Sequence, residues 1–507
     1  MRCRATLTTR AARLWSGRCW SPDQPGCGAS VAALPRRHGD TETRMVPNKT
    51  RIFYGIGSIA EGVKETAFNV FLLFYYNNVL GLPGTWVGAA IFLALCIDAF
   101  TDPLMGVISD NTRSRLGRRH PYMYLAVLPV ALSFALLFAP PDDLSHPALF
   151  CWLLGFTVLL RVSLTLYAVP SNAMAAEMTA DYDERTEIIG IRFLFGWLAG
   201  LGAAVVGFTA FFNEGSGGVD GRMQASAYAE FALYCAIFAG LAILLCAWGT
   251  RDVARLNPHA PDARRSLRAD FAVVWANRSF RALIISAIFS SSAWGYINAV
   301  GYYVNTYFWG LDGDQLGILT LGMVISVIIA ASVSPMLGKL WDKKRSAMAL
   351  ALFAVLFGPL PIGLRLLGWF PENGTRDLVT ALFFFTIILT AALISINIIT
   401  ASMIADLTDQ GEADSGRRLE GAFTSLIVFS VKASSGVGAL LAGVTLDLIA
   451  FPRQQPELAE QSAQTLATAY APAIMVLYAV SLYFLNRYQL TRRQHSQILA
   501  TLAQQRG

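Results

Sequence analysis

Two aspartates, Asp98 and Asp102, lie four residues apart inside a long apolar stretch of the sequence. Four residues make just over one helical turn, so on a helix both carboxylates face the same way, about 6 Å apart along the axis. Carboxylates are costly in hydrocarbon, so such a pair needs a compensating cation, a proton or a water-filled cavity. The spacing predicts a cation-binding site. The alternative is that Asp102 lies at the end of its helix and is solvated near Pro103.

The elements that position this pair are predicted to be membrane-spanning helices. The 507-residue chain is 54% hydrophobic and only 15% charged, whereas ordinary soluble domains carry about 25% charge. Apolar stretches of about 18 residues or more are typical of transmembrane helices. Twelve such stretches are predicted, at residues 53–80, 84–109, 121–140, 147–171, 187–213, 226–249, 281–309, 315–338, 346–368, 376–404, 420–447 and 467–489. The expected fold is an all-α membrane protein of twelve transmembrane helices in two six-helix halves.

Charge alternates with these predicted spans. Arginines and lysines gather between spans 2 and 3, in the central loop, between spans 8 and 9 and after span 12, whereas the other loops are acidic or neutral. By the positive-inside rule both termini are cytoplasmic in a plasma or inner membrane, as an even number of spans requires. The net charge of +6 therefore reflects topology, and a nucleic-acid partner is not expected.

The predicted organisation has five parts. A basic N-terminal extension at 1–44, expected to be disordered, precedes one bundle at 45–250, a central cytoplasmic loop at 251–278, a second bundle at 279–490 and a cytoplasmic tail at 491–507. The extension is interpreted as a non-native upstream segment before Met45 or, alternatively, as a mitochondrial-type transit segment. No predicted outer loop contains a pair of cysteines, so no disulfide framework is expected.

An internal repeat links the two bundles. Pro103, Gly106, Asp110 and Arg113 follow span 2, and the same P-x2-G-x3-D-x2-R spacing follows span 8 as Pro335, Gly338, Asp342 and Arg345. The aspartates and arginines are predicted to form a breakable latch between cytoplasmic helix ends. The loop motif resembles the signature of the major facilitator superfamily, whose two parallel six-helix halves are each built from inverted triplets.

Further segments resemble one branch of that superfamily, the glycoside–pentoside–hexuronide:cation symporters, which include the melibiose carrier. The related animal branch contains the sodium-dependent lysophosphatidylcholine symporters. The matching segments are Tyr54-Gly-Ile-Gly57, Asp98-Ala-Phe-Thr-Asp-Pro-Leu-Met-Gly106, Asn111-Thr-Arg-Ser-Arg-Leu-Gly117, Asp181-Tyr-Asp-Glu-Arg-Thr186 with Arg192, Ala405-Asp-Leu-Thr-Asp-Gln-Gly-Glu412 with Arg418, and Lys432.

The resemblance implies roles for particular residues. Asp98 and Asp102 would bind the coupling cation, sodium or a proton, and Thr101 would lend an oxygen. Lys432 would approach the acid pair from the other half, and Arg192 would line the central cavity. The acidic sugar-binding positions of the melibiose carrier are replaced here by Gly62 and Ala168. Galactoside recognition in that form is therefore not expected.

Three charges occur in the first span. Glu61, Lys64 and Glu65 share one helical face and are predicted either to form a polar cavity site, with Lys64 pairing to Asp98, or to make a local Glu61–Lys64 ion pair. The candidate cavity residues include four acids, Glu61, Glu65, Asp98 and Asp102, and three bases, Lys64, Arg192 and Lys432. Their formal charges sum to one net negative charge. One monovalent cation would neutralise it.

Uncharged polar residues in later spans are candidate substrate contacts. Asn298 and Tyr302 in span 7 lie on one face with Asn305, and Asn397 lies in span 10. Amides and aromatic rings on a cavity wall suit a hydroxylated or amphipathic solute. Hydrogen bonding between helices explains the asparagines equally well.

A second charged cluster surrounds the loop between spans 10 and 11. Its members include Asp406, Asp409, Glu412 and Arg418, and Asp181–Arg185 occupy the corresponding position of the first half. They are predicted to form cytoplasmic ion pairs that hold an outward-open state, or else to belong to a solvated loop.

These observations predict a secondary active transporter that couples symport of a sugar or glycoside-like solute to sodium or protons by alternating access. The alternatives are a cation-coupled transporter of lysophospholipids or other amphipathic lipids, and a non-transporting membrane sensor. The sequence lacks a G-x4-G-K-[ST] loop, a catalytic triad and metal-ligand spacing among its histidines. An enzyme, a cofactor and a metal beyond the coupling ion are therefore not expected, and the expected partners are the solute and the bilayer around a monomer.

Overall fold

The fold is known from a computed structural model that describes residues 45–179, 181–213, 221–252, 275–415, 420–455 and 460–506. Residues 45–507 belong to one compact unit. The expected extension at 1–44 and Arg418 lie outside the described residues. Within the described ranges the structure is helical, without strands, and eleven helices are long and apolar enough to cross a membrane.

The described residues before the central loop, 45–252, are called here the first half and form seven α-helices. They are α1 (Asn48–Ile56), α2 (Ile59–Thr66), α3 (Gly84–Asn111), α4 (His120–Leu137), α5 (His146–Met178), α6 (Tyr182–Val206) and α7 (Ala225–Gly249). The predicted first span at 53–80 is not one α-helix. It consists of the end of α1, α2 and two π-helical stretches, Ala67–Leu72 and Tyr75–Val79, and it is not among the eleven helices that qualify as spans.

The second half comprises the described residues after the central loop, from residue 275 onward. It contains α9 (Arg278–Tyr303), α10 (Gly313–Leu340), α11 (Lys343–Phe357), α12 (Leu360–Leu366), α13 (Arg376–Ser415), α14 (Glu420–Leu448), α15 (Glu460–Asn486) and α16 (Arg492–Arg506). The predicted tail at 491–507 is thus largely helical. Helix α13 runs beyond the predicted end at residue 404, so Asp406, Asp409 and Glu412 lie on its last turns and not in a loop.

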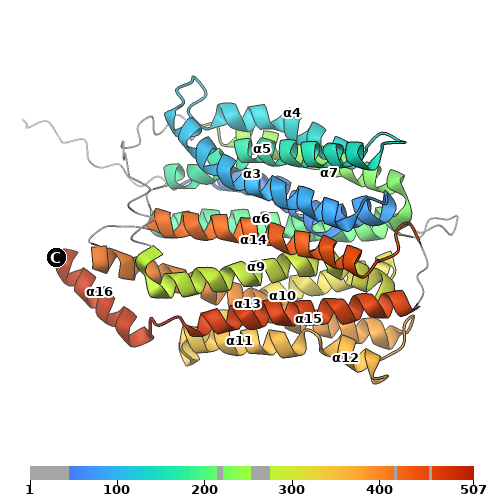
Figure 1. Ribbon diagram of the computed structural model, residues 1–507. Helices are drawn as coiled ribbons and strands as arrows, with labels where there is room; N and C mark the ends of the chain where they lie inside the picture. Colours follow the sequence, from blue (N-terminus) through green and yellow to red (C-terminus); the bar gives the residue numbers. More distant parts are fainter. Residues whose placement is uncertain are drawn as a thin grey trace, which may run out of the picture. The chain divides into compact units, whose positions relative to one another are not determined.

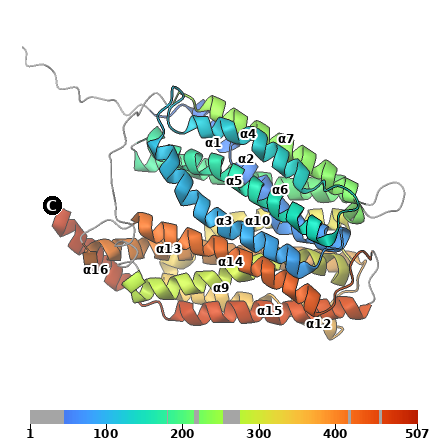
Figure 2. The ribbon, with the colours of Figure 1, turned by 45° about the horizontal axis from the view of Figure 1, so that its top comes forward.

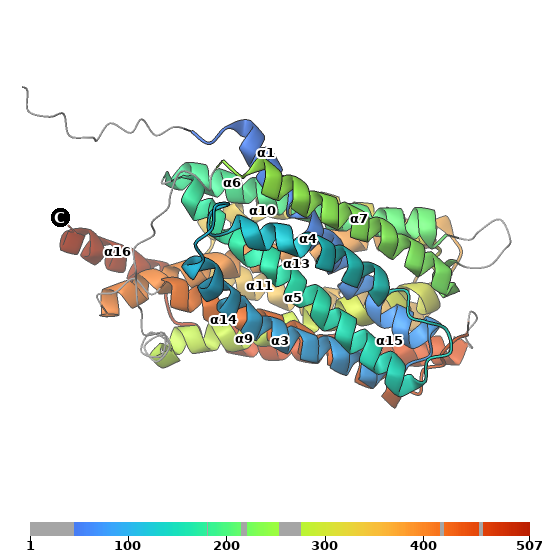
Figure 3. The ribbon, with the colours of Figure 1, turned by 90° about the horizontal axis from the view of Figure 1, so that it is seen from above.

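The helices of unit 45–507 run side by side along one direction (Figure 1). Helix α4 lies between α5 and α7 in the first half (Figure 3), while α9 packs between α14 and α15 in the second. Helix α3 of the first half meets α14 of the second, and α6 meets α10. These two pairs of helices form the seam between the halves.

The two ends of the bundle differ. One end, called here the basic end, carries the arginines of the α3–α4 connection, the basic residues at the end of α10 and the start of α11, and helix α16. Figure 2 shows the halves diverging toward the basic end and converging at the opposite end. Hydrogen bonds join the halves at the opposite end: Tyr303 donates to Asn77 Oδ1 at 2.9 Å, and Asp447 accepts from the Gly84 and Thr85 amides at 3.0 and 2.7 Å.

Glycines bring the helix backbones of the seam into contact. A Cβ atom added at Gly443 of α14 would lie 2.0 Å from the Gly84 carbonyl oxygen of α3. On another face of α14, a Cβ atom at Gly438 would lie 2.2 Å from the Ser292 carbonyl oxygen of α9. Small residues allow such close approach where the bilayer offers no hydrophobic driving force for helix association. Helix α14 therefore packs directly against the backbones of α3 and α9 at these two glycines.

Substitution of Gly443 by alanine tests this contact. We expect Gly443→Ala to lower the free energy of unfolding by about 1–3 kcal/mol, because the added methyl group overpacks against backbone that cannot change rotamer. Thermal unfolding of the purified protein measures the effect. The matched control is Gly155→Ala on α5, where an added Cβ meets nothing within 4 Å and the better helix propensity of alanine should leave stability unchanged or slightly raised. Equal responses of the two variants would contradict the close contact.

Candidate functional site

A cavity of about 1060 Å³ lies between the two halves. Both halves line it: α2, α3, α5 and α6 from the first, and α9, α10, α11, α13, α14 and α15 from the second. The predicted site residues on its wall are Glu61, Lys64, Glu65, Asp98, Asp102, Arg192, Asn298, Tyr302 and Lys432. Two residues that were predicted for the cation or substrate site, Thr101 and Asn397, are not on this wall. Asn397 has an exposed side chain elsewhere on α13, and the Thr101 hydroxyl donates to the Asp98 carbonyl oxygen at 3.2 Å within α3.

The acid pair lies on one face of α3, with side chains 9% exposed for Asp98 and 25% exposed for Asp102. Asp102 is not at a helix end, because α3 continues through Pro103 to Asn111. Lys432 of α14 reaches across the seam: its ammonium lies 3.2 Å from Asp98 Oδ2 and also contacts Asp102 Oδ2. A tethered cation from the second half therefore already occupies the acid pair of the first.

Thr165 of α5 lies between the two carboxylates. Its hydroxyl oxygen is 3.0 Å from Asp98 Oδ1 and 2.9 Å from Asp102 Oδ1. A hydroxyl has one proton and can donate to only one of these oxygens. The other contact is favourable when that carboxyl carries a proton or when a cation lies beside it. Thr165, and not Thr101, thus places a neutral hydroxyl oxygen beside both carboxylates.

Arg161 of α5 is a site residue that sequence reasoning missed. Its guanidinium is buried, lies 3.3 Å from Asp98 Oδ2 and covers the ring of Phe68 at 4.8 Å. An arginine within the apolar run of span 4 was itself the available signal, because intramembrane charges usually belong to functional sites. Its partner lies 63 positions away in sequence, so spacing alone did not connect the two.

Arg161 also corrects the predicted charge of the cavity. The wall carries four acidic residues, Glu61, Glu65, Asp98 and Asp102, and four basic residues, Lys64, Arg161, Arg192 and Lys432. The formal charges of these eight residues sum to zero. The expected surplus of one negative charge is therefore absent from this set.

The charges of the first span pair differently from both expectations. Arg192 of α6 donates to Glu61 Oε1 at 2.5 Å and to the Ser171 hydroxyl at 2.5 Å. Lys64 pairs with its neighbour Glu65. Neither a Lys64–Asp98 contact nor a Glu61–Lys64 pair is among the ion pairs of the described residues. The Arg192–Glu61 pair ties α6 to α2 beside the cavity.

Gly62 and Ala168 show why the cavity lacks the two additional carboxylates. A Cβ atom at Gly62 would lie 2.0 Å from the Gly196 carbonyl oxygen of α6, so this position accepts no side chain while α2 and α6 stay in contact. Ala168 lies on the cavity wall but presents only a methyl group. Neither position therefore offers a carboxylate to the cavity.

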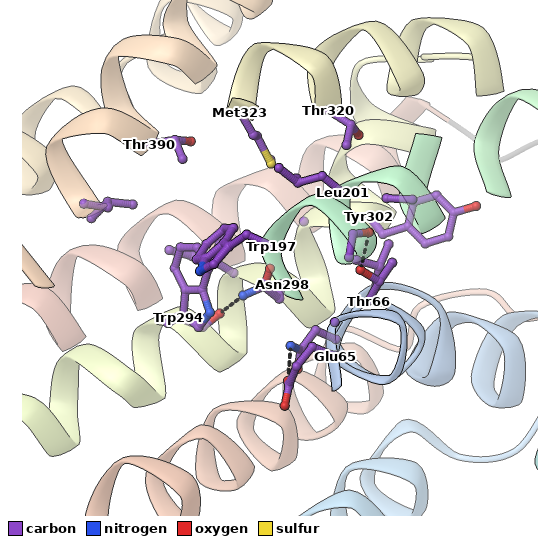
Figure 4. Close-up of a pocket in the computed structure, with 18 of the residues that line it drawn as sticks. Glu65, Thr66, Trp197, Leu201, Trp294, Asn298, Tyr302, Thr320, Met323 and Thr390 are labelled. Carbon is purple, nitrogen blue, oxygen red and sulfur yellow. Dashed lines mark hydrogen bonds between the residues drawn. The ribbon is translucent and has the colours of Figure 1, made fainter. Parts of the chain in front are cut away.

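The second half contributes a wall of different character (Figure 4). Side chains of the second half face side chains of α6 across the cavity, while Glu65 lies on α2 at the cavity wall. The facing residues are Trp294, Met323 and Thr390 from α9, α10 and α13, and Trp197 and Leu201 from α6. The cavity is thus charged on one side and mostly apolar on the other.

The two predicted polar residues of α9 have partners of different kinds. Asn298 donates to the Trp294 carbonyl oxygen at 2.8 Å within α9, so its amide does not bridge two helices. Tyr302 packs against Phe74 of the first half with ring centroids 4.4 Å apart. Of the two, only Tyr302 therefore contributes to contact between the halves through these interactions.

The predicted latch residues gather at the basic end in contacts within each half. Asp110 pairs with Arg119 at 2.5 Å, whereas Arg113 is exposed. Asp406 pairs with Lys343 at 2.7 Å, and Asp409 with His495 of α16 at 3.0 Å. Asp342 is the residue before the first turn of α11, Arg345 is exposed in that turn, and Glu412 is half-buried on α13.

Comparison with known proteins supports this architecture. The model of the MFS/sugar transport protein family matches residues 53–492. The chain is 24% identical to the "Isoprimeverose transporter" of Lactiplantibacillus pentosus over 79% of this chain and 80% of the relative. It is also 24% identical to the "Putative glycoside/cation symporter YagG" of Escherichia coli over 87% of this chain and 92% of the relative.

A solved structure shows the same fold. The nucleoside transporter NupG superposes with a TM-score of 0.58 at 14% sequence identity, covering 88% of this chain and 100% of that chain. The likeness concerns the arrangement of the helices. It agrees with a helical transporter fold of two halves around a cavity.

Because Arg161 and Asp98 are in contact, substitutions at the two positions should have non-additive effects on the free energy of unfolding. We expect Arg161→Gln to lower the free energy of unfolding by about 3–5 kcal/mol, because it leaves a buried carboxylate short of a partner. Adding Asp98→Asn should restore part of that loss. Arg115→Gln, which removes an exposed arginine at the basic end, is the control and should change little. Strictly additive effects in thermal unfolding would show that the two side chains do not interact.

Proposed function

Because the chain belongs to the MFS/sugar transport family, we propose that it couples the movement of a sugar or glycoside-like solute to symport of a monovalent cation. The observation that carries the proposal is the acid pair of α3 on the cavity wall, shared between Lys432 of the other half and the Thr165 hydroxyl. Two carboxylates and a hydroxyl offer oxygen ligands to sodium or bases to a proton. The coupling ion is therefore sodium or a proton.

Competition between the incoming cation and Lys432 for the acid pair would couple cation binding to the movement of the two halves. The cavity charges already balance, so a cation that binds between Asp98 and Asp102 makes the lysine ammonium surplus there. Release of Lys432 removes an ion pair between α3 and α14. Binding energy, and not covalent chemistry, then shifts the populations of the two access states.

The described conformation corresponds to access from the basic end. Hydrogen bonds and aromatic contacts join the halves at the opposite end, while the halves diverge at the basic end (Figure 2). By the positive-inside rule the basic end faces the cytoplasm. In this arrangement solute would exchange with the cytoplasm. The ion pairs at the basic end that can be seen among the described residues, such as Asp110–Arg119 and Asp406–Lys343, each lie within one half, in keeping with an open state on that side.

A hydroxylated solute suits the polar side of the cavity. Glu65, Asn69 and Asn298 present carboxylate and amide groups there, and such groups exchange hydrogen bonds with sugar hydroxyls. Relatives named for isoprimeverose and glycoside transport favour the same class. Since positions 62 and 168 lack carboxylates, recognition relies on these residues.

The apolar wall of the second half favours one further candidate, a lysophospholipid or another amphipathic solute. Trp294, Met323 and Leu393 present large apolar surfaces, and aromatic and aliphatic linings bury apolar ligand surface. A sugar with an apolar aglycone and a lysolipid would both use this wall. A panel of free sugars, aryl glycosides and lysolipids in uptake by proteoliposomes separates the candidates.

Neutralising the acid pair tests the coupling. We expect Asp102→Asn to reduce cation-driven accumulation of solute in proteoliposomes at least about tenfold, since each lost charge pair is worth more than about 1.4 kcal/mol in a buried site. Solute exchange without an ion gradient should persist. Asp377→Asn, at an exposed position outside the cavity on α13, is the matched control.

Sodium and proton gradients, applied separately at constant membrane potential, identify the ion. Unchanged accumulation by Asp98→Asn and Asp102→Asn under both gradients would refute the assigned site.

A further inference from the structure

A second pocket, of about 730 Å³, lies at the basic end of the second half. The start of α9, the start of α11 and the end of α15 with the residues after it form this pocket. It shares no lining residue with the central cavity. Its chemistry is therefore independent of the proposed transport site.

The pocket is lined by four basic side chains. Arg278 and Arg281 come from the first turn of α9, Lys344 from α11, and Arg487 from the segment after α15. No aspartate or glutamate is among the described residues that line it. The pocket wall thus carries a formal charge of four that its own lining does not neutralise.

Two carboxylates act on a residue of the pocket wall. Burial, followed by the charges of Asp406 and Asp342, raises the pKa of the Tyr488 hydroxyl there, so both acids are counted as neighbours of the pocket. Asp406 is itself paired with Lys343 at 2.7 Å. The excess of positive charge in the pocket therefore persists after its neighbours are counted.

Hydrogen bonds fix the frame that carries these charges. Lys344 donates to the Asn486 carbonyl oxygen at 2.6 Å, and the Gln489 amide donates to the Ser279 hydroxyl at 3.1 Å. The Arg487 guanidinium covers the ring of Tyr483 at 4.6 Å. Three elements far apart in sequence are therefore held together around the pocket.

Toward the membrane interior the same pocket becomes apolar. Ala282 and Ile285 of α9 and Phe484 of α15 line it there, and Phe289 stacks on Phe484 one turn further along α9, with ring centroids 6.3 Å apart. Helices α9 and α15 lie side by side in Figures 1 and 2. A basic rim thus continues into an apolar groove between two membrane-spanning helices.

We propose that this pocket binds the phosphate group of an anionic phospholipid from the leaflet at the basic end. The phosphate would lie among Arg278, Arg281, Lys344 and Arg487, and an acyl chain would follow the groove past Ile285 and Phe484. Guanidinium groups bind phosphate oxygens with paired hydrogen bonds. Basic pockets between transmembrane helices on the cytoplasmic side suit anionic lipid headgroups. A soluble phosphate compound would use the rim alone and leave the apolar groove uncovered.

The test uses the purified full-length protein in a mild detergent at fixed ionic strength. We expect added phosphatidylglycerol to raise the thermal unfolding midpoint, and native mass spectrometry to show it retained, whereas phosphatidylcholine does neither at the same concentration. Glycerol 3-phosphate, the soluble headgroup analogue, should have no effect. For the double variant Arg278→Gln with Arg281→Gln, the apparent affinity for phosphatidylglycerol should fall roughly thirtyfold, from the loss of two interfacial charges.

The matched control, Arg115→Gln with Arg251→Gln, removes two exposed arginines at the basic end of the first half and should keep the wild-type affinity. If the first double variant does not fold, Lys344→Gln with Arg487→Gln tests the same pocket. Equal effects of phosphatidylglycerol and phosphatidylcholine, equal losses in test and control variants, or full stabilisation by glycerol 3-phosphate would each overturn the proposal.

Discussion

Charged groups buried between two bundles of helices require partners, and this requirement organises the centre of the protein. Asp98 and Asp102 are tolerated within α3 because Lys432, Arg161 and Thr165 surround them. Two of these partners belong to the same half as the acids, but Lys432 belongs to the other. The attraction between the buried acid pair and Lys432 therefore also holds the two halves together at the cavity wall.

Hydrophobicity made most of the fold predictable. The long apolar runs located eleven of the helices, since a spanning segment must satisfy its backbone internally and present apolar side chains to lipid. The interrupted first span was not foreseen. Phe71 of its first π-helical stretch packs against Phe208 near the end of α6, and Phe74, between the two stretches, packs against Tyr302 of α9, contacts between distant segments that have no local signature in the sequence. The end of α13 was also misjudged, because hydropathy marks the lipid boundary and a helix can continue into water.

The site was predictable in part. The four-residue spacing of Asp98 and Asp102 and the resemblance at Lys432 pointed to residues that the structure brings together. Arg161 and Thr165 were missed because their roles depend on how α5 faces α3, which no spacing within one segment records. Asn397 shows the converse limit: a polar residue in an apolar span resembles a cavity residue in sequence, yet its helix turns it away from the cavity wall.

Helix α14 touches α3 through Gly443 and α9 through Gly438, backbone against backbone. Side chains can adjust to small helix movements by changing rotamer, whereas the backbone contacts at these two glycines cannot. A tilt of α14 would therefore displace the backbones of α3 and α9 at these contacts. Since α14 also carries Lys432, release of that one ammonium group from the acid pair would loosen the same helix that is packed directly against both α3 and α9.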